Sequence, residues 1–312
     1  MKKGSLVYQL MQIVTPMIRF GESRKEEKKK ERERCKKTGE IWNPTRTSGI
    51  YESDTLKTYI KQCCIFLRWI KEKYKIRDIK KITKEMALEY LSYRRDRGDS
   101  AWTLQTIKSA INKIFRFKIN VGNKDIDLPR RKKEDVVRSR VPRAHDKKIN
   151  RDNYMDLITF LHATGLRRNE VKKLKKKNIK RINGVYNVIV LPKAAGGAKN
   201  GRGRVVESLK SMQGEIDDVI RNAKKNNSEY MFPKIPSKLD IHELRAYYAN
   251  DKYDEVVEEL PQAKASDLYI TKDKQVYDKR ALKRVSKNMG HNRIYVIVNS
   301  YSYIKRRTWE KS

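Results

Sequence analysis

The stretch Ile182-Asn183-Gly184-Val185-Tyr186-Asn187-Val188-Ile189-Val190-Leu191 predicts a β-hairpin in the second half of this chain. Asn-Gly between apolar residues is the strongest short-range hairpin signal, because both central residues of a type I′ turn need a positive φ. A third strand is expected at Val205-Val206, after a basic, glycine-rich connection over residues 193–204. Elsewhere the apolar residues recur at helical spacing, so the expected fold class is mainly α with a small β-hairpin or sheet.

The first half of the chain predicts a compact helical domain over residues 49–122. Ser53, Asp54 and Thr55 offer a helix N-cap, and apolar residues then follow at helical spacing. Further helical patterns follow, the last of them after the chain break at Gly98-Asp99-Ser100. The Lys and Arg side chains between the apolar stripes face either solvent or phosphate, and the pattern does not distinguish the two.

Three other segments complete the expected domain organisation. Residues 1–48 are predicted to be a basic, partly disordered N-terminal arm, because the run from Arg24 to Lys37 is almost all charge. An exposed helix held by i,i+4 charge pairs is the alternative for that run. Residues 123–148 contain two prolines and dense basic charge, which predicts a linker. Residues 149–312 are expected to form a second, α+β domain.

The net charge points to a polyanionic partner. Lys and Arg number 75 and Asp and Glu 38 among the 312 residues, so the formal balance is 75 − 38 = +37. Such an excess repels itself in a compact state unless a polyanion neutralises it, and nucleic acid is the first candidate. A membrane surface is the second candidate, but it is disfavoured because the charge is spread over folded-looking segments instead of one amphipathic helix.

The sequence also argues against several classes of protein. No stretch approaches the ~20 uninterrupted apolar residues of a membrane span, and Gln9, Gln12 and Pro16 interrupt the only segment that resembles a signal peptide. Three cysteines without a CxxC motif disfavour a disulfide scaffold or zinc ribbon, and favour the cytoplasm. There is no HExxH motif, and residues 196–202 lack the Gly-Lys-Ser/Thr ending of a phosphate loop. We therefore expect neither a cofactor nor a metal ion.

Three short stretches remain as candidates for chemistry. In the first, Ala163 to Val171, Arg167 lies between the end of one helix and the start of another. In the second, His242 and Arg245 are i and i+3 and so share a helix face. The third is Met289-Gly290-His291-Asn292-Arg293, with Tyr301 ten positions after the histidine. Taken singly, each has a structural explanation: a surface arginine, a half-buried histidine, or a core tyrosine.

Taken in this order, the stretches resemble the boxes of the tyrosine recombinase family, the phage-type integrases that act on mobile elements. TGLRRNEV (164–171) resembles the first arginine box, HELRAYYA (242–249) the H-x-x-R box, and MGHNR…SYSY (289–303) the box with the nucleophile. The family also carries a lysine on a hairpin turn. AKNGRGRV (198–205) fits that pattern if Arg202 replaces its second basic residue.

The resemblance implies a fold and a site. Residues 49–120 resemble the α-helical SAM-like core-binding domain, and the second domain would be the α+β tyrosine recombinase catalytic domain. The implied catalytic residues are Arg167, Lys199, His242, Arg245, His291 and Tyr301.

Each implied role has a chemical reason. Arg guanidinium groups suit the two non-bridging phosphate oxygens, and a tyrosine can attack the phosphorus. Lys199 would protonate the leaving 5′ oxygen, and the histidines would hold phosphate or relay the tyrosine proton. The implied product of cleavage is a 3′-phosphotyrosyl link.

The sequence departs from the family pattern in two places. Arg245 and His291 are 291 − 245 = 46 positions apart, which is longer than usual and predicts an insertion around residues 251–275 of unassigned role. Tyr303 is the reserve nucleophile. Family members place the tyrosine nine or ten residues after the box histidine, and Ser300 occupies the ninth position, which favours Tyr301.

The implied function is metal-independent, site-specific DNA recombination, in a homotetramer that forms on double-stranded recombination sites during synapsis. An accessory DNA-bending or excision factor is a further candidate partner, and the resemblance favours integration and excision over resolution or inversion. Two alternatives remain at this point. One is a type IB topoisomerase, which has a similar site but reseals the same strand. The other is a DNA-binding protein that has lost catalysis.

Overall fold

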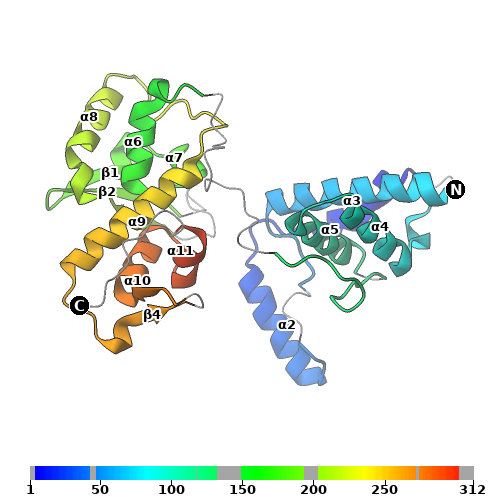
Figure 1. The fold of residues 1–312 in the computed structure, drawn as a ribbon. Helices are drawn as coiled ribbons and strands as arrows, with labels where there is room; N and C mark the ends of the chain where they lie inside the picture. The colour runs from blue at the N-terminus through cyan, green and yellow to red at the C-terminus, as the bar shows by residue number, and fades with distance from the viewer. Residues whose placement is uncertain are drawn as a thin grey trace. The chain divides into compact units, whose positions relative to one another are not determined.

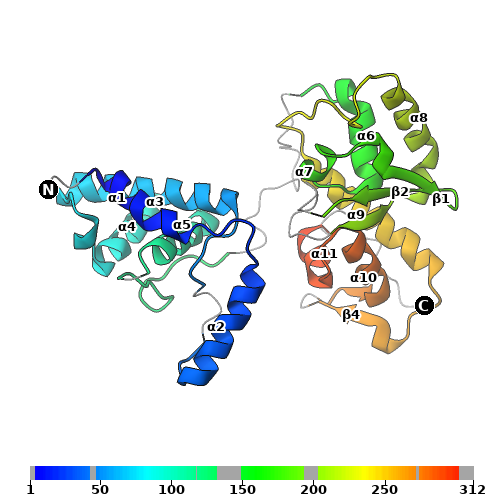
Figure 2. The same ribbon diagram turned by 180° about the vertical axis from the view of Figure 1, so that it is seen from behind.

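The computed structural model describes residues 4–42, 47–116, 118–131, 149–192, 203–271 and 274–301. The chain divides into two compact units, residues 1–132 and 133–312 (Figures 1 and 2). The described part of the first unit is helical. The second unit combines helices with a three-stranded and a two-stranded antiparallel sheet. The predicted fold class, mainly α with a small sheet, is confirmed.

The described residues of the first unit form the α-helices α1 (Leu6–Val14), α2 (Arg24–Thr38), α3 (Ser53–Tyr74), α4 (Lys84–Asp96) and α5 (Ala101–Ile114). Short polar side chains cap the starts of α4 and α5. Thr83 Oγ1 accepts a hydrogen bond from the Met86 amide and Ser100 Oγ accepts one from the Thr103 amide. The predicted chain break before α5 is present, and Gly98 there has a φ of 82°.

Aromatic rings from α3, α4 and the residue after α5 form the centre of this unit's core. The Phe66 ring lies 5.0 Å from the Tyr90 ring and 5.9 Å from the Phe115 ring, measured between centroids. All three residues are at most 1% exposed. Burial of such large rings supplies much of the hydrophobic stabilisation of a small helical domain.

Residues 1–48 differ from the predicted arm, because α1 is part of the core. Leu6, Leu10 and Val14 are buried there at i, i+4 and i+8. The Gln9 side chain fixes the helix further: its Nε2 donates to the Arg77 carbonyl at 2.9 Å, and its Oε1 accepts from the Ile79 amide at 2.9 Å. The apolar spacing that predicts this packing lies in a segment that otherwise reads as basic.

The charged run 24–37 takes the helical alternative, as α2. Ser23 caps its start, and Gly39 ends it with a φ of 70°. Glu27 Oε1 accepts hydrogen bonds from the Ser48 amide at 2.6 Å and the Ser48 hydroxyl at 2.7 Å, which ties α2 to the segment before α3. At the other end of the unit, Ile126 and Leu128 of the predicted linker are buried in the same core. Residues 132–148 of that linker lie outside the described residues.

The second unit contains the predicted hairpin. Its elements are α6 (Met155–Thr164), α7 (Arg168–Val171), β1 (Ile179–Ile182), β2 (Val185–Val190), β3 (Arg204–Glu207), α8 (Gln213–Lys224), α9 (Ile241–Glu259), β4 (Leu268–Ile270), β5 (Val276–Asp278), α10 (Lys279–Asn288) and α11 (Ile294–Ser300). The strand order is β1-β2-β3, all antiparallel. Asn183 and Gly184 have φ values of 51° and 77°, as an Asn-Gly turn requires.

Helix α9 is the central element of this unit, and it packs against both α6 and α10 (Figure 1). Residues 251–275, where the sequence predicts an insertion, contain the last turns of α9 and strand β4, which pairs with β5 just beyond them. The hairpin was not predicted, because strands of three residues are too short to show an alternating pattern. No helix among the described residues is long and apolar enough to cross a membrane.

The packing of α1 gives a first prediction. Leu10→Ala removes a side chain that is fully buried and should reduce the free energy of unfolding by about 2–5 kcal/mol. Val7→Ala, in the same helix but 48% exposed, is the matched control and should change it by less than about 0.5 kcal/mol. Urea denaturation measures both values. Equal effects of the two substitutions would mean that α1 is not part of the core.

Candidate active site

The first arginine of the site lies at a sharp junction between two helices. Gly165 ends α6 with a φ of 58°, and Arg167 is the N-cap residue of α7. A Cβ at Gly165 would lie 2.3 Å from Cδ1 of the buried Tyr248 ring. Only glycine therefore fits this turn, both for its positive φ and for its close contact with α9.

The Arg167 guanidinium points to the C-terminal segment of the chain. Its Nη1 donates to Glu170 Oε1 at 2.9 Å, and its Nη2 lies 3.4 Å from His291 Nε2 and 3.5 Å from the Gly290 carbonyl. The side chain is 21% exposed, so it remains within reach of a ligand. Arg167 and His291, which are 124 positions apart in the sequence, thus meet at one point.

The second arginine is carried by the first turns of α9. Asp240 caps this helix by accepting hydrogen bonds from the His242 and Glu243 amides at 3.1 and 3.2 Å. Arg245 is 3% exposed, donates from Nη1 to the Gly165 carbonyl, and places Nη2 3.3 Å from the Tyr301 hydroxyl. Burial lowers the pKa of Arg245, but a guanidinium stays charged in proteins.

Tyr301 follows α11 and is enclosed by the other candidate residues. Its ring stacks on the His242 ring, with centroids 4.9 Å apart and planes 9° apart. The Arg245 guanidinium carbon lies 5.4 Å from the centre of the Tyr301 ring. Its hydroxyl is 3.1 Å from His291 Nε2. The phenol is therefore held by three polar groups and is 4% exposed.

The environment of His291 favours the neutral imidazole. Burial, reinforced by the charges of Arg167, Arg245 and Arg204, lowers its pKa from 6.5 to about 3. A neutral imidazole that is protonated on Nδ1 has an acceptor lone pair on Nε2. The Tyr301 hydroxyl can then donate its hydrogen to that lone pair.

Two residues that the sequence did not mark as functional complete the cluster. Glu170, whose side chain is 2% exposed, receives Nη1 and Nη2 of Arg204 at 2.8 and 2.9 Å in a bidentate pair. Burial would raise the pKa of Glu170, but hydrogen bonds and charge from Arg204, together with the charge of Arg167, hold it at about 2. The sequence signal that could have revealed Glu170 is its i,i+3 spacing from Arg167.

The structure therefore brings together five of the six predicted residues: Arg167, His242, Arg245, His291 and Tyr301. The sixth, Lys199, lies outside the described residues, as do Arg202 and the reserve nucleophile Tyr303. Four of the five line an open cavity of about 840 Å³, together with Lys238. Among the described residues, no group of three or more His, Cys, Asp or Glu side chains could hold a metal ion.

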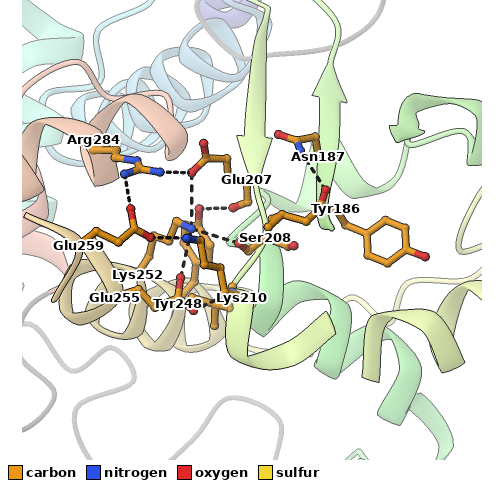
Figure 3. Close-up of polar contacts among 12 residues, drawn as sticks. Tyr186, Asn187, Glu207, Ser208, Lys210, Tyr248, Lys252, Glu255, Glu259 and Arg284 are labelled. Atoms are coloured by element: carbon orange, nitrogen blue, oxygen red, sulfur yellow. Dashed lines mark hydrogen bonds and ion pairs between the residues drawn. The ribbon is translucent and has the colours of Figure 1, made fainter. Parts of the chain in front are cut away.

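A second polar cluster fastens β3 to the helices that carry the site (Figure 3). Lys252 of α9 is fully buried, and its Nζ donates to the Ser208 carbonyl and to Glu255 Oε2, each at 3.1 Å. Arg284 of α10 pairs with Glu207 of β3 at 3.0 Å. The far end of β3 is therefore tied to both α9 and α10.

Comparisons with known proteins agree with this architecture. Residues 51–122 match the family described as phage integrase, N-terminal SAM-like domain. The chain is similar in structure to XerH site-specific recombinase bound to palindromic difH, with a TM-score of 0.51, 16% identity, and coverage of 95% of this chain and 89% of that one. It is equally similar to a lambda integrase dimer bound to a COC′ core site, with a TM-score of 0.51, 14% identity, and coverage of 91% and 98%. This chain has the fold of a tyrosine recombinase. No curated protein matches the sequence significantly.

The turn at Gly165 gives a second prediction. Gly165→Ala should destabilise the protein by clearly more than the about 1–2 kcal/mol of left-handed backbone strain, because the new methyl group also meets Tyr248. Gly184→Ala is the matched control, since Gly184 has a φ of 77° with no other atom near its Cβ position. The difference between the two free energies of unfolding isolates the contact, and no difference would refute it.

The low pKa of His291 gives a third prediction. Above about pH 3 the folded protein holds a neutral imidazole, whereas the unfolded chain takes up a proton as the pH falls through about 6.5. Acidification from about pH 6.5 to pH 4.5 should therefore destabilise the wild type more than His291→Asn. The free energy of unfolding over this range checks the difference. Direct ¹⁵N NMR of the His291 ring should show no titration above about pH 5.

Proposed function

We propose that this protein is a site-specific DNA recombinase that cuts and rejoins strands through a covalent bond between Tyr301 and DNA. The observation that carries the proposal is a connected cluster beside an open cavity: Arg245 and His291 contact the Tyr301 hydroxyl, and Arg167 contacts His291. A phosphodiester resists attack because its charge repels nucleophiles, and two guanidinium groups counter that charge.

The proposed cleavage step uses these groups in sequence. Arg167 and Arg245 bind the two non-bridging oxygens of the scissile phosphate and stabilise the charge that develops on them. The Tyr301 oxygen attacks phosphorus as its proton passes to His291 Nε2, and the bond to the 5′ oxygen breaks. The DNA 3′ phosphate is left joined to the tyrosine.

The role of His242 is argued from its position in the structure, and that of Lys199 from the sequence. The stacked His242 ring fixes the orientation of the phenol, and its imidazole adds a donor toward phosphate. The proton for the 5′ oxygen is assigned to Lys199 on the sequence pattern alone. Attack by the 5′ hydroxyl of a different strand reverses the step and joins the exchanged DNA without an external energy source.

The proposed partner is double-stranded DNA at recombination sites, on which four copies assemble. The net charge of +37 supports a polyanionic ligand. The similar structures are those of XerH bound to difH substrate and of a lambda integrase dimer bound to a core site. A tetramer and an accessory DNA-bending or excision factor follow from the family resemblance.

Covalent capture tests this function without knowledge of the target. Purified protein is incubated with a randomised library of nicked duplexes. Cleavage near the nick releases a short fragment that carries the 5′ hydroxyl, and its loss traps the adduct. Denaturation-resistant complexes are then recovered, their DNA is sequenced, and the modified peptide is identified by mass spectrometry. We expect enrichment of one DNA motif, joined to Tyr301.

Tyrosine variants sharpen the test. Tyr301→Phe should abolish the adduct, whereas Tyr295→Phe, at an exposed tyrosine of the preceding helix α11, should leave it intact. Loss of the adduct in Tyr303→Phe but not in Tyr301→Phe would move the nucleophile. DNA binding without an adduct in any condition would exclude a recombinase, and relaxation of plasmids lacking the motif would indicate a topoisomerase.

A further inference from the structure

Arg204, the first residue of β3, uses every nitrogen of its guanidinium inside the protein. Nη1 and Nη2 bind the two oxygens of Glu170, and Nε donates to the Asn288 carbonyl at 2.6 Å. The side chain is only 9% exposed. Arg204 is therefore poorly placed to bind DNA itself, and its effect on the site must pass through the groups that it holds.

The first of those groups is Glu170, which lies between two arginines. Its Oε1 accepts from both Arg167 at 2.9 Å and Arg204 at 2.8 Å. The three side chains together carry two positive charges and one negative charge, a balance of +1. Without Arg204, Arg167 and Glu170 would form a neutral ion pair. Glu170 would then compete with a phosphate for the Arg167 guanidinium.

The second group is the chain that leads from α10 to His291. The Asn288 carbonyl accepts a hydrogen bond from Arg204 Nε, and two residues further on Gly290 lies close to the same guanidinium. A Cβ at Gly290 would lie 3.0 Å from Arg204 Nη1 and 3.1 Å from Cζ. Arg204 thus supports the backbone from which His291 reaches Tyr301.

We propose that Arg204 is a positioning residue that saturates Glu170, so that the charge of Arg167 stays available to a phosphate, and that supports the backbone before His291. The inference rests on the proposed function for its catalytic consequence. Its electrostatic part concerns phosphate binding and can be measured without any reaction.

A set of variants separates this role from a general loss of stability. Arg204→Met should slow single-turnover adduct formation by about 100-fold, the size expected when a charge-stabilising group is lost. Arg204→Met combined with Glu170→Gln restores the +1 balance and should recover at least about 10-fold of that loss. Arg204→Lys should not recover it, because an ammonium group cannot form the bidentate pair.

Lys252→Met is the matched control. It removes a buried cation from the other end of β3, where it binds Ser208 and Glu255, and leaves Glu170 and Asn288 untouched. We expect it to lower the free energy of unfolding, but to leave the adduct rate of the folded protein within about threefold of wild type. All rates are compared at a temperature where each variant is folded by circular dichroism.

Binding of inorganic phosphate supplies the readout that needs no cleavage. Titration is followed through the ¹⁵N shifts of the His291 ring. Arg204→Met should weaken phosphate binding by at least about 10-fold, and the added Glu170→Gln should restore it. If wild type binds phosphate there but forms no adduct with any DNA, the proposed function fails while this inference stands.

Three results would overturn the inference. One is wild-type phosphate affinity in Arg204→Met. Another is an Arg204→Met defect, in phosphate binding or in adduct formation, that Glu170→Gln does not relieve. The third is a wild-type protein whose His291 ring does not respond to phosphate at all.

Discussion

The crowding of positive charge around one phenol is the constraint on which the candidate active site depends. Arg245 is almost fully buried beside Tyr301, and Arg167 lies on the other side of His291. Buried charges are costly unless they are paired, and the buried carboxylate of Glu170 is a counter-charge that the protein itself supplies. A DNA phosphate would add the negative charge that this arrangement lacks, so the unbound site is already organised for an anion.

The same crowding sets the charge state of His291, the proposed base. In the free protein, burial and the neighbouring arginines keep His291 neutral, so Nε2 can accept the tyrosine hydrogen. A phosphodiester bound between those arginines would offset their charge and raise the basicity of the imidazole. The histidine would then become a better proton acceptor only when substrate is present. On the proposed mechanism, this coupling would link phosphate binding to activation of the nucleophile.

Local signals in the sequence predicted the parts of the fold that depend on local chemistry. The Asn183-Gly184 turn needs positive φ at both residues, and His242 and Arg245 share a face because they are one turn apart. The pairing of Glu170 with Arg204 could not be read in this way, because 34 positions separate them and a charge pair has no periodicity. The packing of α1 was missed for a different reason: dense charge nearby outweighed three apolar residues at helical spacing.

Strand β3 is joined by polar contacts to the three helices around the site, α7, α9 and α10. It has four residues, and a charged side chain holds each end. Arg204 pairs with Glu170 of α7 and donates to the Asn288 carbonyl at the end of α10. Glu207 pairs with Lys252 of α9 and with Arg284 of α10. The helices so fastened carry or precede the site arginines and His291. The Arg204 end of β3 contacts Glu170 and the carbonyl of Asn288, close to the site, whereas the Glu207 end is held by Lys252 and Arg284 and contributes to the stability of the fold.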